Sequence, residues 1–264
     1  MTTIPRPKAL VTGAGARLGQ AMAVTLAERG FDVAIHYASS ISGAEETARA
    51  VQAAGGQAAL LQADLLNEAE TQALLPKVAE ALGGPITCLV NNASIFEYDN
   101  IATATRESWD RHLESNLRAP FVLTQALASQ CPAAEMDERG EPRARGLVVN
   151  LIDQRVRKLT PEFMTYTIAK MGLWAFTQTA AQALAPHVRV NAIGPGPTLQ
   201  GHRQTAEHFD RQRRATVLER GSNPEDITGA LRYFLDAPAV TGQLLCIDGG
   251  QHLAWETPDI LGVE

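Results

Sequence analysis

Residues 9–20 read ALVTGAGARLGQ, an apolar run that leads through a glycine-rich turn into a helical sequence. Glycine permits a tight turn and a close approach of phosphate, and a helix N-terminus behind it offers free N–H groups. The stretch therefore predicts a phosphate cradle. Gly13, Gly15 and Gly19 do not complete a G-x-G-x-x-G pattern, because Leu18 takes the third place, so a plain tight turn stays open. Arg17 stands where a further glycine is expected.

Apolar strands and helices alternate through most of the remaining chain. Strands are expected at Lys8–Val11, Asp32–His36, Gln57–Gln62, Thr87–Asn91, Gly146–Ile152, Val188–Ala192 and Leu244–Ile247. Helices are expected at Leu18–Arg29, Gly43–Ala54, Glu68–Leu82, Ser108–Ser129 (interrupted at Pro120), Pro161–Ala185 and Pro224–Leu235. Repeated β-α units with short apolar strands predict a Rossmann-type α/β fold, a doubly wound parallel sheet with helices on both faces. We expect one domain over residues 1–264, with long loops at Cys131–Arg145 and from Gly196.

Composition excludes several classes of protein. The chain has 264 residues and a formal charge of −6, which argues against a general nucleic-acid binder. The basic cluster Arg211, Arg213 and Arg214 is read as a solvated helix face. No apolar run approaches the ~20 residues that span a bilayer, and no secretory signal opens the chain. The Cys and His residues show no metal-ligand spacing, so we expect a cytoplasmic protein without a metal.

Two polar elements have the spacing of catalytic groups. Tyr166 and Lys170 lie four residues apart in a predicted helix, so they share one face. An ammonium there lowers the pKa of a phenol from about 10 toward working pH, although a plain surface pair is the alternative. Asp153 follows the apolar strand GLVVNLI, where α/β active sites lie, and it donates a proton only if burial or a partner keeps it protonated. A loop cap is the other reading of Asp153.

A third polar element follows the strand TCLV. Asn91, Asn92, Ala93 and Ser94 come directly after it, and Phe96 follows closely. Small polar residues at this place bind a ribose or a substrate edge, or they simply form a turn. The aromatic ring stacks on a flat ligand, or it belongs to the core.

Taken together, these motifs resemble the short-chain dehydrogenase/reductase family over about Lys8–Gly250. That family has T-G-x-x-x-G-x-G, N-N-A-G, an active-site Ser or equivalent, Y-x-x-x-K and a final D-G-G. The corresponding residues here are Thr12–Gly19, Asn91–Ser94, Asp153, Tyr166 with Lys170, and Asp248–Gly250. Asn116 matches the helical asparagine of the family's catalytic tetrad. The resemblance implies that Asp153, Tyr166, Lys170 and Asn116 are catalytic.

Three positions depart from the common pattern, and all three resemble the pteridine reductase branch. Arg17 replaces a glycine, Ser94 ends the N-N-A-S segment, and Asp153 replaces the serine. Phe96 and the polar Cys131–Arg145 insertion also match that branch. The resemblance implies a pterin-like substrate held by Arg17, Ser94, Phe96, Asp153 and Tyr166.

The cofactor expected is NADP(H). An acidic residue after the second strand would grip the ribose of NAD, but His36–Ser40 holds no carboxylate. No arginine stands there either, and Arg17 offers a compensating cation for phosphate. The resemblance implies these cofactor-binding residues: Gly13, Arg17, Leu18, Gly19, Tyr37, Ser39, Ser40, Asp64, Leu65, Asn92, Ala93, Ser94, Tyr166, Lys170, Pro195, Gly196 and Thr198.

The function implied is reduction of a pterin C=N bond. NADPH would supply hydride, Asp153 and Tyr166 would supply or relay protons, and Lys170 would bind the nicotinamide ribose and lower the pKa of Tyr166. Asn116 would hold a water linking Lys170 to solvent. The alternatives are a carbonyl reductase acting on 3-oxoacyl or other ketones, and a dinucleotide-binding regulator without turnover.

Two segments are assigned by position in the chain. Residues 196–220 are expected to form a substrate loop that meets the tail of the pterin. The C-terminal tail, residues 251–264, has apolar anchors at Trp255, Pro258, Ile260 and Leu261. The resemblance implies a homotetramer with this tail at a subunit interface, while a frayed terminus is the alternative.

Overall fold

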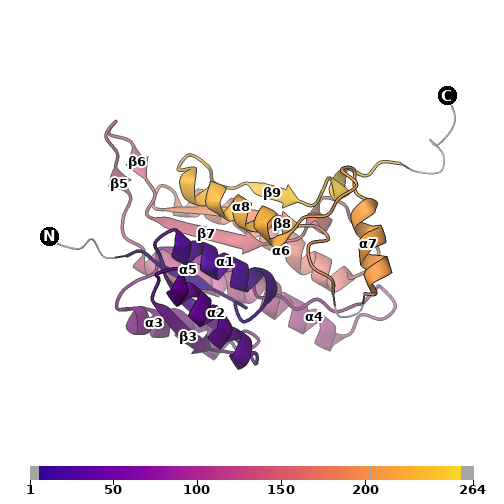
Figure 1. The fold of residues 1–264 in the computed structure, drawn as a ribbon, viewed down its shortest axis with the longest axis horizontal. Helices are drawn as coiled ribbons and strands as arrows, with labels where there is room; N and C mark the ends of the chain where they lie inside the picture. The colour runs from indigo at the N-terminus through magenta and orange to yellow at the C-terminus, as the bar shows by residue number, and fades with distance from the viewer. Residues whose placement is uncertain (1–5, 202–203, 257–264) are drawn as a thin grey trace.

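The fold is built on a seven-stranded parallel sheet in the order β3-β2-β1-β4-β7-β8-β9. The computed structural model describes residues 6–201 and 204–256 (Figure 1). The sheet strands are β1 (Lys8–Val11), β2 (Asp32–Tyr37), β3 (Ala58–Gln62), β4 (Cys88–Asn91), β7 (Gly146–Leu151), β8 (Val188–Pro195) and β9 (Leu244–Ile247). The chain leaves β1 toward β2 and β3, then returns to place β4 on the other side of β1. This reversal is the switch point at which doubly wound sheets bind ligands.

Helices cover both faces of the sheet, as predicted. The helices are α1 (Arg17–Glu28), α2 (Ile41–Ala53), α3 (Glu68–Leu82), α4 (Arg106–Leu113), α5 (Ala119–Gln130), α6 (Met164–Leu184), α7 (Ala206–Arg214) and α8 (Pro224–Asp236). Alternate residues of each strand face opposite layers: in β1, Val11 joins the cluster with α1, α2 and α8, and Leu10 joins the cluster with α3, α5 and α6. Strands buried on both faces explain the unbroken apolar runs in the sequence.

The main differences from the predicted helices lie at Pro120 and at the start of α6. The helical stretch after residue 105 does not break at Pro120, which lies in the first turn of α5. A π-helical segment, Glu114–Arg118, instead joins α4 to α5. The predicted start of α6 at Pro161 is also wrong, because Phe163 has a φ of 55° and the helix begins at Met164. A left-handed residue cannot continue a right-handed helix.

The two long loops contain structure of their own. Cys131–Arg145 holds a small antiparallel hairpin of β5 (Glu135–Met136) and β6 (Pro142–Arg143). Residues 196–220 contain α7, which the sequence reading missed. Arg213 on α7 does not lie on a solvated face as predicted, since its guanidinium donates to the Pro197 and Ser222 carbonyls at 2.9 and 2.6 Å. This arginine fastens α7 to the chain on both sides of it.

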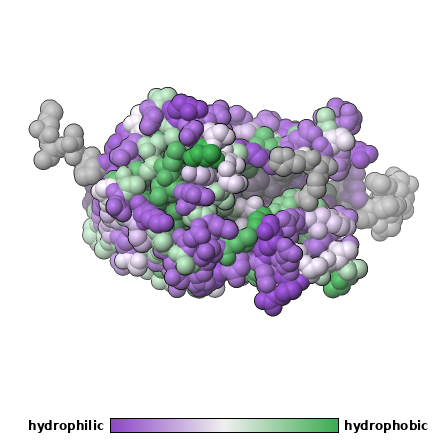
Figure 2. All heavy atoms as spheres, turned by 90° about the horizontal axis from the view of Figure 1, so that it is seen from below, coloured by the Kyte–Doolittle hydropathy of each residue, from purple (hydrophilic) through white to green (hydrophobic). Residues whose placement is uncertain are grey.

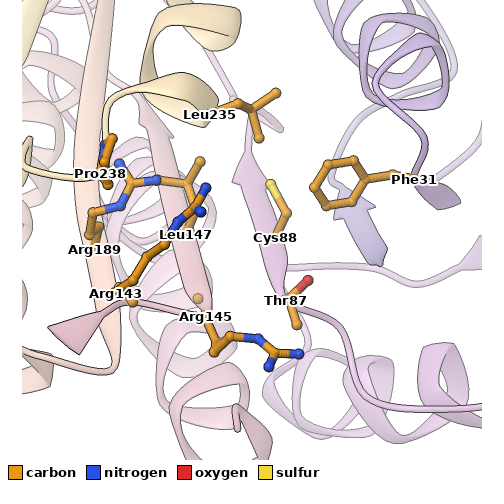
Figure 3. A pocket seen from close by; sticks show the side chains of 11 residues that line it. Phe31, Thr87, Cys88, Arg143, Arg145, Leu147, Arg189, Leu235 and Pro238 are labelled. Atoms are coloured by element: carbon orange, nitrogen blue, oxygen red, sulfur yellow. The ribbon is translucent and has the colours of Figure 1, made fainter. Parts of the chain in front are cut away.

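The amino ends and the carboxyl ends of the parallel strands have different surroundings. The arrows of β7 and β9 point to the end of the molecule where α4 and α7 lie, and the β5–β6 hairpin projects from the other end (Figure 1). Figure 3 shows a cavity of about 120 Å³ at the amino ends of β4, β7 and β8, lined in part by Arg143, Arg145 and Arg189. The residues expected to bind cofactor follow the carboxyl ends of the strands, on the side of the sheet opposite to this cavity. In the described ranges, none of the helices has both the length and the apolar character needed to traverse a bilayer.

Candidate active site

The glycine turn after β1 is packed too tightly for side chains at two positions. Gly13 has a φ of +62°, and a Cβ there would lie 2.9 Å from the Cα of Ala93. A Cβ on Gly19 would lie 2.3 Å from the Gly13 carbonyl oxygen. The third position is Arg17, whose φ of 54° is in the left-handed region that favours glycine. The sequence therefore placed a long cation on a backbone that suits glycine.

The segment after β4 is tied directly to this turn. The Thr12 hydroxyl accepts hydrogen bonds from the amides of Asn92 and Ala93, both at 3.0 Å. In return, the Asn92 side-chain amide donates to the carbonyls of Thr12 and Gly13, at 2.9 and 3.1 Å. His36 supports the turn from β2, because its Nδ1 accepts from the Gly13 amide at 3.0 Å. Burial lowers the pKa of His36, which keeps Nδ1 free to accept.

The turn and α1 together fit a dinucleotide phosphate. Ala16 is the N-cap residue of α1 and makes no capping hydrogen bond with its side chain, and the first turn holds no acidic residue. The first amides of α1 thus keep donors for an anion, with the helix dipole favouring negative charge. Ser40 lies against the turn, since a Cβ on Gly15 would meet the Ser40 carbonyl oxygen at 3.0 Å. The predicted binding of a cofactor ribose or phosphate by Tyr37, Ser39 and Ser40 stays a prediction.

Arg17 extends toward the segment that follows β8. Its guanidinium Nη2 donates to the Leu199 carbonyl at 3.0 Å, and its side chain is exposed. The contact joins the glycine turn to the predicted substrate loop. The predicted contacts of Arg17 with cofactor phosphate and with a pterin edge stay predictions.

The Asp153–Tyr166 pair joins β7 to α6. The Tyr166 hydroxyl donates to Asp153 Oδ2 at 3.0 Å, and Asp153 Oδ1 accepts from the Arg155 amide at 2.8 Å. Tyr166 also shares a hydrogen bond with the Ser94 side chain. Lys170 is buried below them, where its Nζ donates to the Leu151 carbonyl at 2.8 Å. The structure thus brings Ser94, Asp153 and Tyr166 together, as the sequence predicts.

Burial dominates the protonation of these groups. Desolvation raises the pKa of the Asp153 carboxyl, and it lowers the pKa of Lys170 to about 8. Desolvation, followed by the neighbouring Asp153 charge, raises the pKa of Tyr166 well above its ordinary value. The predicted lowering of the Tyr166 pKa by Lys170 is therefore wrong for this geometry. Burial thus favours the protonated form of both Asp153 and Tyr166.

An aromatic pair stands beside the phenol. Phe96 stacks on Phe163 with ring centroids 4.3 Å apart and planes 13° apart. Its centroid also lies 4.7 Å from the Tyr166 ring, in an edge-on arrangement. The Phe96 side chain is 44% exposed, so it retains surface on which a flat ring can stack. Phe163 is a site residue that the sequence reading missed, because no motif marks it.

Asn116 lies in the π-helical segment, in contact with the segment that follows β4. Its side-chain nitrogen donates to the Ile95 carbonyl at 2.9 Å, which supports the chain between Ser94 and Phe96. The Asn116 side-chain oxygen is buried without a partner. This unpaired oxygen is an acceptor for the predicted water, which stays a prediction.

A family model described as short chain dehydrogenase matches residues 7–210. The chain belongs to the short-chain dehydrogenase family. FolM alternative dihydrofolate reductase 1 from Brucella canis, complexed with NADP, is 43% identical, with 97% of this chain and 98% of that chain covered and a TM-score of 0.89. The Brucella suis protein of the same name, in complex with NADP, is also 43% identical, covers 98% and 100%, and has a TM-score of 0.88. A 3-oxoacyl-[acyl-carrier-protein] reductase from Synechocystis sp. is 30% identical, over 95% of this chain and 98% of its own.

Other predicted residues of this short-chain dehydrogenase lie around the same edge of the sheet. Asp64 and Leu65 follow β3, and Asp64 Oδ1 accepts from the Leu66 amide at 3.0 Å. Pro195 ends β8, and Gly196 packs so closely that a Cβ would lie 2.5 Å from the Asp248 Cα. Thr198 is buried just beyond it. Leu18 packs against the core from the first turn of α1.

Figure 2 shows that the face seen from below is hollowed in the half where α4 and α7 lie.

The C-terminal tail is described as far as residue 256. Gln251–Leu253 forms a short 3₁₀ turn, and Trp255 is 66% exposed. Pro258, Ile260 and Leu261 lie outside the described residues. No cluster of three or more His, Cys, Asp and Glu side chains suited to a metal ion occurs within residues 6–201 and 204–256.

Proposed function

We propose that this short-chain dehydrogenase is an NADPH-dependent reductase of pterins or dihydropterins, with folates in the same substrate class. The observation that carries the proposal is the partly buried Asp153–Tyr166 hydrogen bond beside the exposed ring of Phe96. The identity to the two FolM dihydrofolate reductases supports it.

The cofactor proposal rests on the glycine turn and on the end of β2. The close packing at Gly13 and Gly19, with uncapped amides on α1, suits a pyrophosphate. Tyr37, Ser39 and Ser40 present hydroxyls where a carboxylate would repel a 2′-phosphate. The FolM structures were determined with NADP, which supports the same choice here. NADPH would supply a hydride to the substrate carbon.

The protein's own part in the reaction is proton delivery. Reducing a C=N bond adds hydride to carbon and a proton to nitrogen, so the site must present an acid. Burial raises the pKa of both Asp153 and Tyr166, which favours the protonated, proton-donating form of each. The phenol hydrogen-bonds to the carboxyl, so either group can pass a proton and be resupplied by the other. Lys170 stays largely charged at pH 7, with a pKa of about 8, and suits a ribose hydroxyl.

The test replaces the carboxyl. We expect Asp153→Ala to lower kcat with dihydropterin and NADPH by about 10²–10⁴-fold, the range typical of a positioned acid. NADPH oxidation measures the rate, and Asp236→Ala, at the exposed C-terminal end of α8 and outside the predicted site, is the matched control. Turnover by the Asp153→Ala variant equal to that of the control would show that Asp153 has no part in the reaction.

A carbonyl reductase is the second candidate, favoured by the 30% identity to the 3-oxoacyl reductase. Tyr166 would serve as the acid there too, but ketone reduction in this family normally uses a hydroxyl at the place of Asp153. A panel of dihydropterins, dihydrofolate and 3-oxoacyl substrates with NADPH separates the two activities. Cofactor binding without turnover on the whole panel would instead indicate a regulator.

We also propose a cytoplasmic homotetramer. An apolar groove of about 480 Å³ on the α5–α6 side is lined by Leu113, Leu117, Phe121 and Phe176, among others. Glu114 and Arg118 border the same groove and carry opposite charges. Arg118 already pairs with Glu68, so the apolar residues support the proposal: such a surface can pair with its own copy about a two-fold axis.

A further inference from the structure

A buried polar chain lies behind the aromatic pair, and its members belong to none of the family motifs. Asp99, His112 and Thr165 have exposed fractions of 2%, 0% and 2%. Asp99 belongs to the segment after β4, His112 to α4 and Thr165 to the first turn of α6. Three separate elements therefore meet through polar groups. Burying such groups destabilises the fold unless each of them has a hydrogen-bond partner.

The hydrogen bonds run in one direction along this chain. The Glu97 amide donates to His112 Nε2 at 3.1 Å, so Nε2 carries no proton. His112 Nδ1 then donates to the Thr165 hydroxyl at 2.7 Å. The Thr165 hydroxyl in turn donates to Asp99 Oδ2. The carboxylate that ends the chain also accepts from the Ser108 hydroxyl and the Thr165 amide, each at 3.1 Å.

Two members of the chain are next to residues of the site in sequence. Glu97 follows Phe96, and Thr165 precedes Tyr166. The backbone carbonyl of Asp99 accepts from the Phe163 amide at 2.8 Å, next to the ring that stacks on Phe96. Phe163 has a φ of 55°, a strained conformation that persists only where the surroundings hold it. The Asp99 carbonyl is one of the contacts that hold Phe163 in this conformation.

We propose that Asp99, His112 and Thr165 are positioning residues that set Phe96 and Phe163 against Tyr166. They act through the backbone of residues 96–99 and 163–166 and touch no reacting atom. The predicted consequence concerns the pterin and not the cofactor, because the glycine turn is held separately by Thr12, Asn92 and His36. The proposal rests on the proposed function for the identity of the substrate.

The test removes one hydroxyl and keeps its shape. Thr165→Val breaks both side-chain links of Thr165, whereas Thr165→Ser retains them. Thr124→Val is the matched control, since Thr124 is also a buried helical threonine but donates only to the Pro120 carbonyl. We expect Thr165→Val to lower kcat/KM for dihydropterin by about tenfold or more, the effect of an unpaired buried polar group. The Kd for NADPH, measured by fluorescence, should stay that of wild type, and Thr165→Ser should restore activity.

Each outcome bears on the proposal. Equal kcat/KM in Thr165→Val and Thr124→Val overturns it, and so does a parallel loss of NADPH affinity, which would indicate general loosening. If Thr165→Val does not fold, Ser108→Ala removes a different donor to Asp99 and is judged by the same criteria. If wild type reduces no dihydropterin, the proposed function is wrong. The positioning role of the polar chain is then tested by amide hydrogen exchange. Faster exchange of the Glu97, Phe163 and Thr165 amides in Thr165→Val than in Thr124→Val supports it, and equal exchange refutes it.

Discussion

Arg17 places a guanidinium in the site at the cost of a strained backbone, and two substitutions separate the effect of the guanidinium from the effect of the strain. Arg17→Ala removes the guanidinium and its bond to the Leu199 carbonyl but leaves a Cβ at a φ of 54°. Arg17→Gly makes the same loss and also relieves the backbone. The left-handed region costs an L-residue about 1–2 kcal/mol, and glycine returns about 0.5–1 kcal/mol of that as unfolded-state entropy. We therefore expect Arg17→Gly to be more stable than Arg17→Ala by about 0.5–1 kcal/mol.

The assay is urea unfolding of both variants at one protein concentration, since assembly would otherwise shift the midpoint. A difference of this size corresponds to about 1–4 °C in Tm for a chain of this length. Turnover of dihydropterin should fall equally in both variants, because both lack the guanidinium. Equal stability of the two variants would refute the strain argument, and full activity in both would refute a binding role for Arg17.

Two further predictions concern Lys170 and the apolar groove. Lys170→Met should abolish turnover yet stabilise the protein at pH 7 by up to about 3 kcal/mol, because folding lowers the Lys170 pKa to about 8 and so disfavours the charged form. Lys170 is protonated below about pH 10.4 in the unfolded chain and only below about pH 8 in the folded protein. The free energy of unfolding of wild type should therefore rise relative to that of Lys170→Met as the pH increases from 8 to 10. The same difference in unfolding free energy at pH 7 and pH 10 would contradict this. Phe121→Glu, in the groove on α5, should reduce the mass measured by light scattering while the isolated subunit stays folded, and an unchanged mass would place the interface elsewhere.

Much of the fold could be predicted because it depends on local pattern. Strands such as β4 and β7 are apolar on both faces, so their runs are easily found and their parallel pairing follows from the helices between them. The errors fall where a tertiary contact decides. The start of α6 depends on how Phe163 packs against Phe96, and α7 depends on Arg213 binding carbonyls before and after it. Neither contact leaves a periodic signal in the sequence.

Part of the candidate site could also be predicted from the sequence, and part could not. Asp153 and Tyr166 could be predicted to meet because each lies in a motif with a known place on the fold, and the structure joins them. The chain through Asp99, His112 and Thr165 could not, because its members come from three elements and have no common spacing. A lone buried histidine is uninformative until its two ring nitrogens are seen to have partners.

The protonation of Tyr166 shows why spacing alone misleads in this site. A separation of four residues places Lys170 on the same helix face, but its Nζ is turned to the Leu151 carbonyl and lies 5.7 Å from the centre of the phenol ring. Asp153, which comes from another element, is hydrogen-bonded to the phenol and acts with burial to raise its pKa. A phenolate would suit removal of a proton from an alcohol, whereas reduction of a C=N bond needs a proton donor. The replacement of a serine hydroxyl by Asp153 therefore favours the protonated phenol, the form that the proposed reduction requires.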